Sequence, residues 1–147
     1  MTDPNSKPRR RILTVNCNAG SQISLTSLLT QAGYAVDHAA NGRVAARMHR
    51  LNPFDAAIVE IVMLEKNDLE TLIQLTSHPS PPKLIAMSEK GRISAEVFLT
   101  MARHLGVQGA LARPSQLGQL LDALHRVIDE NIDAKPTCRA EVLRGGN

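Results

Sequence analysis

The feature that most constrains the fold is a run of aliphatic residues from Ala56 to Ile61, interrupted only by Glu60. An apolar run of this length is typical of a strand buried on both faces, as in the centre of a parallel sheet. A carboxylate near the carboxyl end of such a strand stands where open α/β sheets gather their ligands and chemistry. Glu60 is therefore the first candidate site residue.

The rest of the chain repeats this pattern of a short aliphatic run followed by a longer segment with helical spacing. The predicted strands are 12–15, 34–38, 56–61, 83–87 and 108–112, and the predicted helices are 21–31, 43–51, 68–77, 94–105 and 115–130. Gly33 stands where the glycine after the first helix belongs, Asn41-Gly42 marks a turn, and Asp68 is a natural N-cap. Five strand–helix units predict a doubly wound α/β fold with helices on both faces of one parallel sheet. We place this domain at residues 11–130, between a basic flexible arm, 1–10, and a flexible tail or truncated linker, 131–147.

Charge and composition argue against several classes of function. The net charge of +3 arises in residues 1–11, where Lys7 and three consecutive arginines oppose one aspartate, and only 2% of the residues are aromatic. The chain has few aromatic side chains on which bases could stack, so nucleic acid is not the expected partner. No apolar stretch is long enough for a membrane span and no signal peptide precedes the domain, so we expect a cytoplasmic protein. Hydrolase, phosphate-loop and zinc motifs are absent, and we expect no enzyme, no catalytic residue and no metal ligand.

Further polar residues follow the other predicted strands. Asn16 and Cys17 come after the first strand, Ser88 after the fourth and Arg113 after the fifth. Since the carboxyl ends of parallel strands share one edge, we expect these residues and Glu60 to form one pocket. Cys17 is either a reactive thiol or an inert filler. The five histidines have no ligand-like spacing, and we expect all of them on the surface or on helix faces.

Six short stretches, in the right order, resemble the receiver domain of response regulators. They are Ile12–Val15, Gln31–Val36, Ala39–Gly42, Phe54–Glu60, Met63 and Gly106–Pro114. The resemblance covers residues 11 to about 130 and implies a flavodoxin-like, CheY-like (βα)5 fold with strand order 2-1-3-4-5. It also implies a role in two-component, phosphorelay signal transduction.

The active-site positions depart from the pattern of that family. The chain has Asn16 and Cys17 for an acidic pair that holds Mg²⁺, Glu60 for the phosphoacceptor aspartate, Ser88 for a hydroxyl residue, Arg113 for a lysine and Ala110 for the switch aromatic. An amide, a thiol and one carboxylate make a poor Mg²⁺ site, and phosphoryl transfer depends on such electrostatic stabilisation. We therefore predict a degenerate pseudo-receiver that binds Mg²⁺ weakly or not at all and is not effectively phosphorylated.

The environment of Glu60 admits two interpretations. Its longer side chain reaches into the space of a phosphoryl group, and the planar guanidinium of Arg113 suits a carboxylate. In one interpretation Ser88 and Arg113 hold Glu60 and fix the surrounding loops in a single state, which imitates either the modified or the resting form. In the other, Glu60 points into solvent.

By resemblance, the expected partner is a signalling protein that contacts the face of the fourth helix, fifth strand and fifth helix. The candidate contact residues are Phe98, Met101, Ala110, Gln116 and Gln119. A homodimer through the same face is the second expectation. Two alternative functions remain: a phosphoaccepting response regulator with an unusual active site, and a flavodoxin-like binder of a small cofactor. The leading hypothesis, a pseudo-receiver that acts through protein contacts, requires no cofactor.

Overall fold

Strands and helices alternate along the chain in the computed structural model, which describes residues 9–15, 19–61, 66–88, 94–112 and 118–129. The strands are β1 (Arg11–Val15), β2 (Ala35–Ala39), β3 (Ala56–Glu60), β4 (Lys83–Ser88) and β5 (Gly109–Ala112). The helices are α1 (Ala19–Gln31), α2 (Gly42–Leu51), α3 (Lys66–Thr76), α4 (Ala95–His104) and α5 (Gly118–Leu124), which continues as the π-helical η1 (His125–Asp129). Every predicted strand is present, with ends that differ by about one residue.

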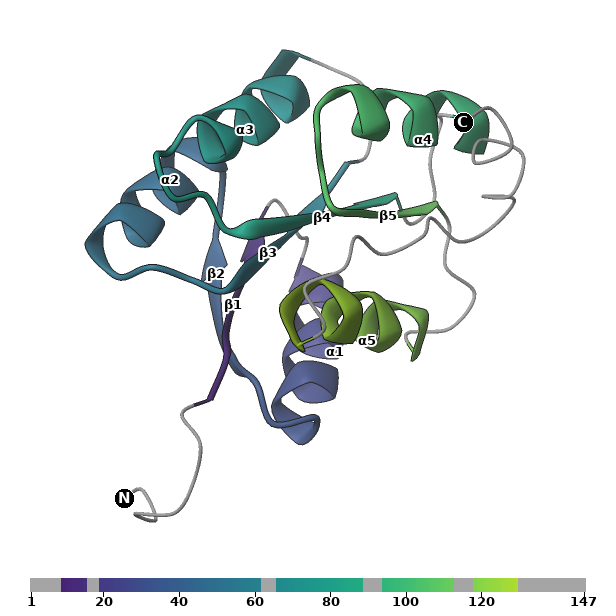
Figure 1. The fold of residues 1–147 in the computed structure, drawn as a ribbon. Coiled ribbons are helices and arrows are strands. Elements are labelled where there is room, and N and C mark those ends of the chain that lie inside the picture. The colour runs from purple at the N-terminus through teal and green to yellow at the C-terminus, as the bar shows by residue number, and fades with distance from the viewer. Residues whose placement is uncertain (1–8, 16–18, 62–65, 89–93, 113–117, 130–147) are drawn as a thin grey trace.

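The strands form one parallel sheet in the order β2-β1-β3-β4-β5 (Figure 1). This is the predicted flavodoxin-like order 2-1-3-4-5. Val15 pairs with Val59, and Glu60 pairs with Met87 one position further along. The carboxyl ends of β1, β3 and β4 therefore lie side by side at one edge of the sheet, as the sequence predicts.

An apolar layer covers each face of the sheet. Helices α2, α3 and α4 lie over one face, and α1 and α5 lie over the other (Figure 1). In the first layer α4 contributes the fully buried Phe98 and Leu99, and in the second α1 contributes Leu25 and Leu29. Burying aliphatic side chains on both faces of the sheet is the main force that holds this architecture together.

Two glycines lie at positions where the sequence predicts a helix end or a turn, and each allows a backbone arrangement that a side chain would hinder. Gly33, just after α1, has a φ of +98°, a left-handed conformation that a glycine adopts without steric cost. Gly42 begins α2, and Asn41 before it caps the helix by accepting a hydrogen bond from the Val44 backbone N–H at 3.0 Å. A Cβ atom on Gly42 would lie 2.6 Å from Cα of Thr71, so α2 and α3 approach this closely only because the residue is glycine.

Some predicted boundaries need correction. Helix α3 begins at Lys66, so Asp68 lies inside its first turn and is not the N-cap. The last predicted helix, 115–130, is described from Gly118 and changes to π-helical hydrogen bonding at His125. Residues 1–8 and 130–147, which make up most of the predicted arm and tail, lie outside the described residues, and the domain limits stay a prediction.

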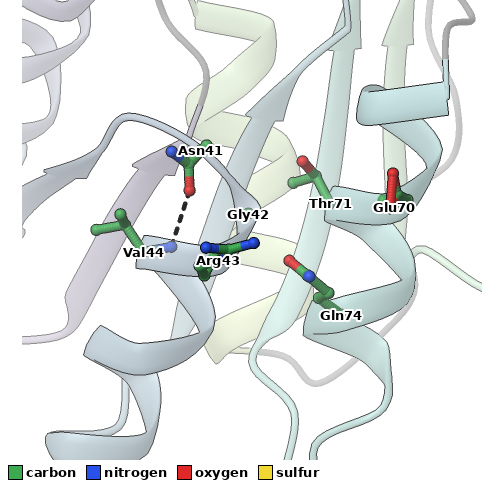
Figure 2. A pocket seen from close by; sticks show the side chains of 7 residues that line it. All are labelled: Asn41, Gly42, Arg43, Val44, Glu70, Thr71 and Gln74. Atoms are coloured by element: carbon green, nitrogen blue, oxygen red, sulfur yellow. Dashed lines mark hydrogen bonds between the residues drawn. The ribbon is translucent and has the colours of Figure 1, made fainter.

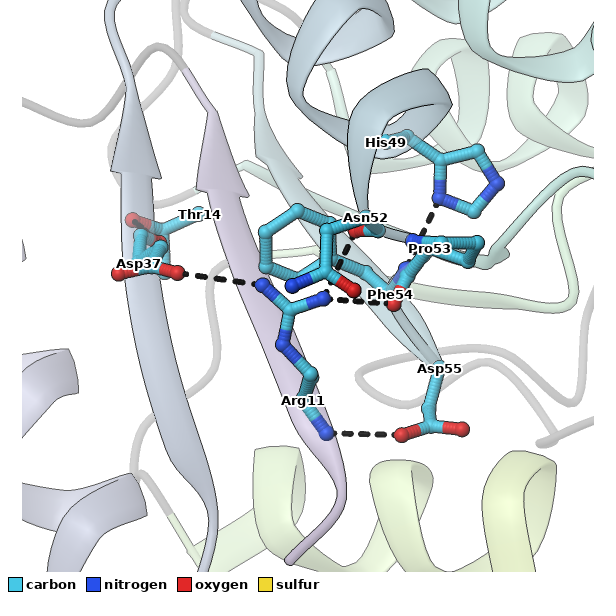
Figure 3. Close-up of polar contacts among 8 residues, drawn as sticks. All are labelled: Arg11, Thr14, Asp37, His49, Asn52, Pro53, Phe54 and Asp55. Atoms are coloured by element: carbon cyan, nitrogen blue, oxygen red, sulfur yellow. Dashed lines mark hydrogen bonds and ion pairs between the residues drawn. The ribbon is translucent and has the colours of Figure 1, made fainter.

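At the amino end of the sheet, Arg11 joins three segments (Figure 3). Its Nη1 donates to two consecutive carbonyl oxygens in the loop before β3, at 2.7 and 2.8 Å. Its Nη2 lies 3.5 Å from a carboxylate oxygen of Asp37, and its guanidinium carbon lies 4.1 Å from the ring centroid of Phe54. The backbone N–H of Arg11 also donates to Asp55 at 2.7 Å. The start of β1 is thereby tied to both neighbouring strands.

The sequence predicts that all histidines lie on the surface or on helix faces. His49 does lie on helix α2, but on its buried side. Its side chain is only 2% exposed. The Phe54 backbone N–H donates to Nδ1 at 3.0 Å (Figure 3), and Nε2 lies 2.7 Å from the carbonyl oxygen of Ser80. Because Nδ1 accepts, the ring proton of the neutral imidazole is on Nε2, which donates to Ser80. Two backbone partners thus compensate for burial of the ring.

Candidate functional site

The candidate site lies at the carboxyl edge of the sheet, where β3 ends at Glu60 and β4 ends at Ser88. Glu60 is 4% exposed and Ser88 is 1% exposed. The backbone N–H of Ile61 donates to the Met87 carbonyl oxygen at 2.7 Å, which holds the chain against β4 just beyond Glu60. The burial of Glu60 rules out the interpretation in which its carboxylate points into solvent.

The other three predicted pocket residues are Asn16, Cys17 and Arg113, and all three lie outside the described residues. In the sequence, Asn16 and Cys17 follow Val15, the last residue of β1, and Arg113 follows Ala112, the last residue of β5. The ion pair between Glu60 and Arg113 therefore stays a prediction. In the part of the chain that the structure describes, no three His, Cys, Asp or Glu side chains gather in a way that could hold a metal ion.

The position of the switch aromatic is occupied by a buried methyl group. Ala110 lies in β5 beside Ala86 of β4 and is 4% exposed. It belongs to the same apolar cluster as Phe98, which comes from α4 and is fully buried. The aromatic rings of this layer are Phe98 from α4 and Phe54 from the loop before β3, while β5 contributes only a small side chain.

The predicted contact surface of α4, β5 and α5 needs correction at two residues. Phe98 and Ala110 are both buried, so neither can contact a partner on the surface shown. The reason is that α4 turns Phe98, Leu99 and Ala102 toward the sheet, leaving Val97 on the outside at 51% exposure. Met101 and Gln119 are partly exposed, and Gln116 lies outside the described residues.

A second surface feature, not predicted from the sequence, lies between α2 and α3. One hollow beside Gly42, of about 590 Å³, includes Arg43, Glu70, Thr71 and Gln74 in its lining (Figure 2). A neighbouring hollow of about 620 Å³ shares Arg43 and Gln74 and continues along both helices. The only sequence signal for this feature is the row of three arginines, at positions 43, 47 and 50.

No helix among the described residues combines the length and the apolar character that crossing a membrane requires.

Comparison with known proteins agrees with the fold. Three similar solved structures are a LuxR-family two-component response regulator from an Aurantimonas species, the receiver domain of a putative LuxO repressor protein from Vibrio parahaemolyticus, and the chemotaxis response regulator CheY4 of Vibrio cholerae. The first is 16% identical with a TM-score of 0.76, over 92% of this chain and 94% of that one. The second is 15% identical with a TM-score of 0.70, over 95% and 98% of the two chains. The third is 24% identical with a TM-score of 0.63, over 82% and 99%.

Of the two sequence comparisons, only the one with family models finds a match. A search of curated proteins finds no significant match. A family model, the response regulator receiver domain, matches residues 12–125, which include the five strands except Arg11 and the positions of Glu60, Ser88 and Ala110. This chain belongs to the response regulator receiver domain family.

Proposed function

We propose that this chain is an atypical receiver domain that acts through protein contacts and does not require phosphorylation. Receiver domains are signalling domains of two-component response regulators, are generally not enzymes, and contact proteins such as kinases and effector domains. The observation that carries the proposal is the burial of Glu60. It stands at the phosphoacceptor position and is 4% exposed. A carboxylate must reach the phosphorus atom in line to accept a phosphoryl group, and this one is covered.

The chemistry of the surrounding sequence supports the same conclusion. Asn16 and Cys17 replace two acidic residues, so Glu60 is the one anionic oxygen donor among these three positions. Mg²⁺ prefers several hard oxygen ligands, and without it the charge on an incoming phosphoryl group is not neutralised. The proposed site therefore binds Mg²⁺ weakly or not at all.

The proposed output is a constant contact surface formed by α4, β5 and α5. Ala110 has no ring that could move between two positions. On our proposal the conformation of this surface therefore does not change with a signal. Val97, Met101 and Gln119 are among its exposed or partly exposed side chains. A signalling partner is the proposed occupant, and a second copy of this chain is the alternative.

The direct test is amide NMR of the full chain, titrated first with Mg²⁺ and then with beryllofluoride, a phosphoryl mimic. We expect no saturable shift of the Glu60, Ser88 or Ala110 amides at millimolar concentrations. The control is the variant Asn16→Asp/Cys17→Asp/Glu60→Asp/Arg113→Lys, which restores the family's residue types and should gain Mg²⁺-dependent shifts. Saturable shifts in the unaltered chain that spread to α4 would overturn the proposal.

A second candidate function is phosphorylation at an unusual active site. It is favoured by Ser88, which keeps the family's hydroxyl residue at the end of β4. The test is incubation with acetyl phosphate and Mg²⁺, followed by intact-mass measurement, with Glu60→Gln as the control. A phosphoryl adduct on the unaltered chain that is absent from Glu60→Gln would establish this function in place of the first.

The proposed pairing of Glu60 with Arg113 is tested by a double-mutant cycle. Removing one partner of a buried ion pair leaves the other charge without compensation, so Arg113→Ala should destabilise the fold. We expect a coupling free energy above about 1 kcal/mol between Arg113→Ala and Glu60→Gln in urea unfolding. Additive effects of the two substitutions would show that the side chains do not interact.

A further inference from the structure

The outer side of α2 carries a stripe of positive charge. Arg43, Arg47 and Arg50 are spaced by four and three residues, which places them on one side of the helix, and all three are exposed. Helix α2 contains no acidic residue. In the part of the chain that the structure describes, no carboxylate forms an ion pair with any of the three, whereas Arg11 is paired with Asp37. This stripe is free to attract an anionic partner.

Beside the stripe lies the larger hollow between α2 and α3. Arg43, Ala46 and Arg50 line it on the α2 side, and Ile73 and Ser77 are among its α3-side residues. Among the described residues that line this hollow, none is a carboxylate. Ile73 is 50% exposed, and the small side chain of Ala46 leaves the space open. The surface therefore combines a cationic rim with an apolar wall.

Both ends of α2 are held in place, so the groove is present before any partner binds. At the start of α2, Gly42 packs against Thr71 of α3, at a spacing that leaves no room for a Cβ atom (Figure 2). Near its end, His49 is hydrogen bonded to the carbonyl oxygen of Ser80 and to the backbone N–H of Phe54. A preformed groove avoids the cost of ordering its own elements when it binds.

We propose that the groove between α2 and α3 binds an amphipathic helix of a partner protein that carries carboxylates along one side and aliphatic side chains along the next. Helices of this kind bind in grooves through apolar anchors spaced by three or four residues. The aliphatic residues would contact Ile73, and the carboxylates would pair with Arg47 and Arg50.

Charge complementarity also gives the proposed helix a preferred position. Glu70 lines the neighbouring hollow together with Arg43, so a carboxylate at that end is repelled. The acidic residues of the partner should therefore lie toward Arg47 and Arg50. A nucleic acid matches this surface less well, because its phosphate backbone has no counterpart to the apolar Ile73.

This inference goes beyond the proposed function and does not rest on it. The groove lies on the outside of α2 and α3, and neither Glu60 nor Ser88 lines it. A negative result at one surface therefore leaves the other proposal intact.

The test uses a fluorescein-labelled helical peptide of about 18 residues, long enough to form several turns, with glutamates on one side and leucines on the next. Its binding to the full chain is measured by fluorescence anisotropy at low and high salt. The variant Arg43→Gln/Arg47→Gln/Arg50→Gln should weaken binding by about tenfold or more. The matched control, Arg9→Gln/Arg103→Gln/Arg126→Gln, removes the same charge elsewhere and should change affinity by less than about twofold, as rim charges distant from a site do.

Two further variants sharpen the assignment of the groove. Ile73→Ser should weaken binding because it removes the apolar wall, and Glu70→Gln should strengthen it about twofold because it removes a repelling charge. Circular dichroism establishes that each variant is folded, and amide NMR should place the peptide-induced shifts at Ala46 and Ile73.

Several outcomes would overturn the proposal. A peptide with glutamine in place of glutamate that binds equally well would remove the role of charge. Equal loss in the two triple variants would show an effect of net charge alone. A DNA duplex that binds the stripe more tightly than the peptide would assign the surface to nucleic acid.

Discussion

The two edges of the sheet bury polar groups for different purposes. At the amino edge, Arg11 and His49 each make several hydrogen bonds to backbone atoms of neighbouring segments. Arg11 is partly buried and His49 fully buried. At the carboxyl edge, Glu60 and Ser88 are buried as completely as His49, but they end two adjacent central strands where an α/β sheet gathers its chemistry. Comparing the two shows that burial alone does not distinguish a structural polar group from a functional one. The hydrogen-bond partners of a buried polar group and its position along the strand distinguish the two kinds.

Polar side chains at the amino edge should contribute more to the free energy of unfolding than those at the carboxyl edge.

His49→Ala should lower the free energy of unfolding by about 3 kcal/mol. The substitution opens a cavity in a buried region and leaves the Phe54 N–H and the Ser80 carbonyl oxygen without their partner. Urea unfolding followed by circular dichroism measures the change. His104→Ala, at an exposed position on α4, is the control and should change stability by less than about 0.5 kcal/mol. A loss at His49 below that of the control would break the comparison.

Arg11→Met should cost about 2 kcal/mol. It keeps most of the aliphatic stem but removes two hydrogen bonds to carbonyl oxygens and the contact with the Phe54 ring. The weak ion pair with Asp37 is largely screened by solvent and adds little. Arg47→Met, on the exposed side of α2, is the matched control and should leave the unfolding midpoint nearly unchanged. Equal effects of the two substitutions would mean that the Arg11 contacts contribute nothing.

Gly42→Ala should destabilise the protein by about 1–2 kcal/mol, because the new methyl group meets the backbone of Thr71 and forces α2 from α3. Gly118→Ala is its control. A Cβ atom at Gly118 meets nothing within 4 Å, so alanine there should be neutral or slightly stabilising. If Gly42→Ala is also neutral, the close contact does not set the spacing of these helices.

Ser88→Ala should have the smallest effect, less than about 1 kcal/mol, since it removes one hydroxyl group and leaves the packing volume nearly unchanged. Thermal unfolding in parallel with His49→Ala gives the comparison directly. A loss as large as that of His49→Ala would show that the carboxyl edge is held by hydrogen bonds to the same degree as the amino edge.

Much of the fold could be predicted from local patterns. The apolar run before Glu60 and the alternation of short and long segments were sufficient for the sheet and its five helices. The position of Gly33 also followed from local chemistry, since a helix of this kind commonly ends at a glycine with positive φ. These features depend on neighbours in the sequence, which is why a single sequence reveals them.

Two features that the sequence did not reveal depend on interactions between segments distant in sequence. His49 is buried because Ser80, 31 residues away, accepts its hydrogen bond, and no local pattern reveals this. The burial of Phe98 did have a local signal, because Leu99 and Ala102 lie on the same side of α4. The resemblance to the receiver family instead suggested that Phe98 belongs to the contact face. The groove beside α2 was missed because it depends on the contact of Gly42 with Thr71, in a different helix.

The attachment of Arg11 has a practical consequence for labelling experiments. Strand β1 begins at Arg11, at the amino edge, and Val15 at its other end is next to the strand that carries Glu60. Five residues of strand span roughly 15 Å. A dye joined to the backbone just ahead of Arg11 would therefore sit that far from the carboxyl edge while following the tumbling of the whole sheet. Such a label reports the size of any complex that forms without blocking the carboxyl edge.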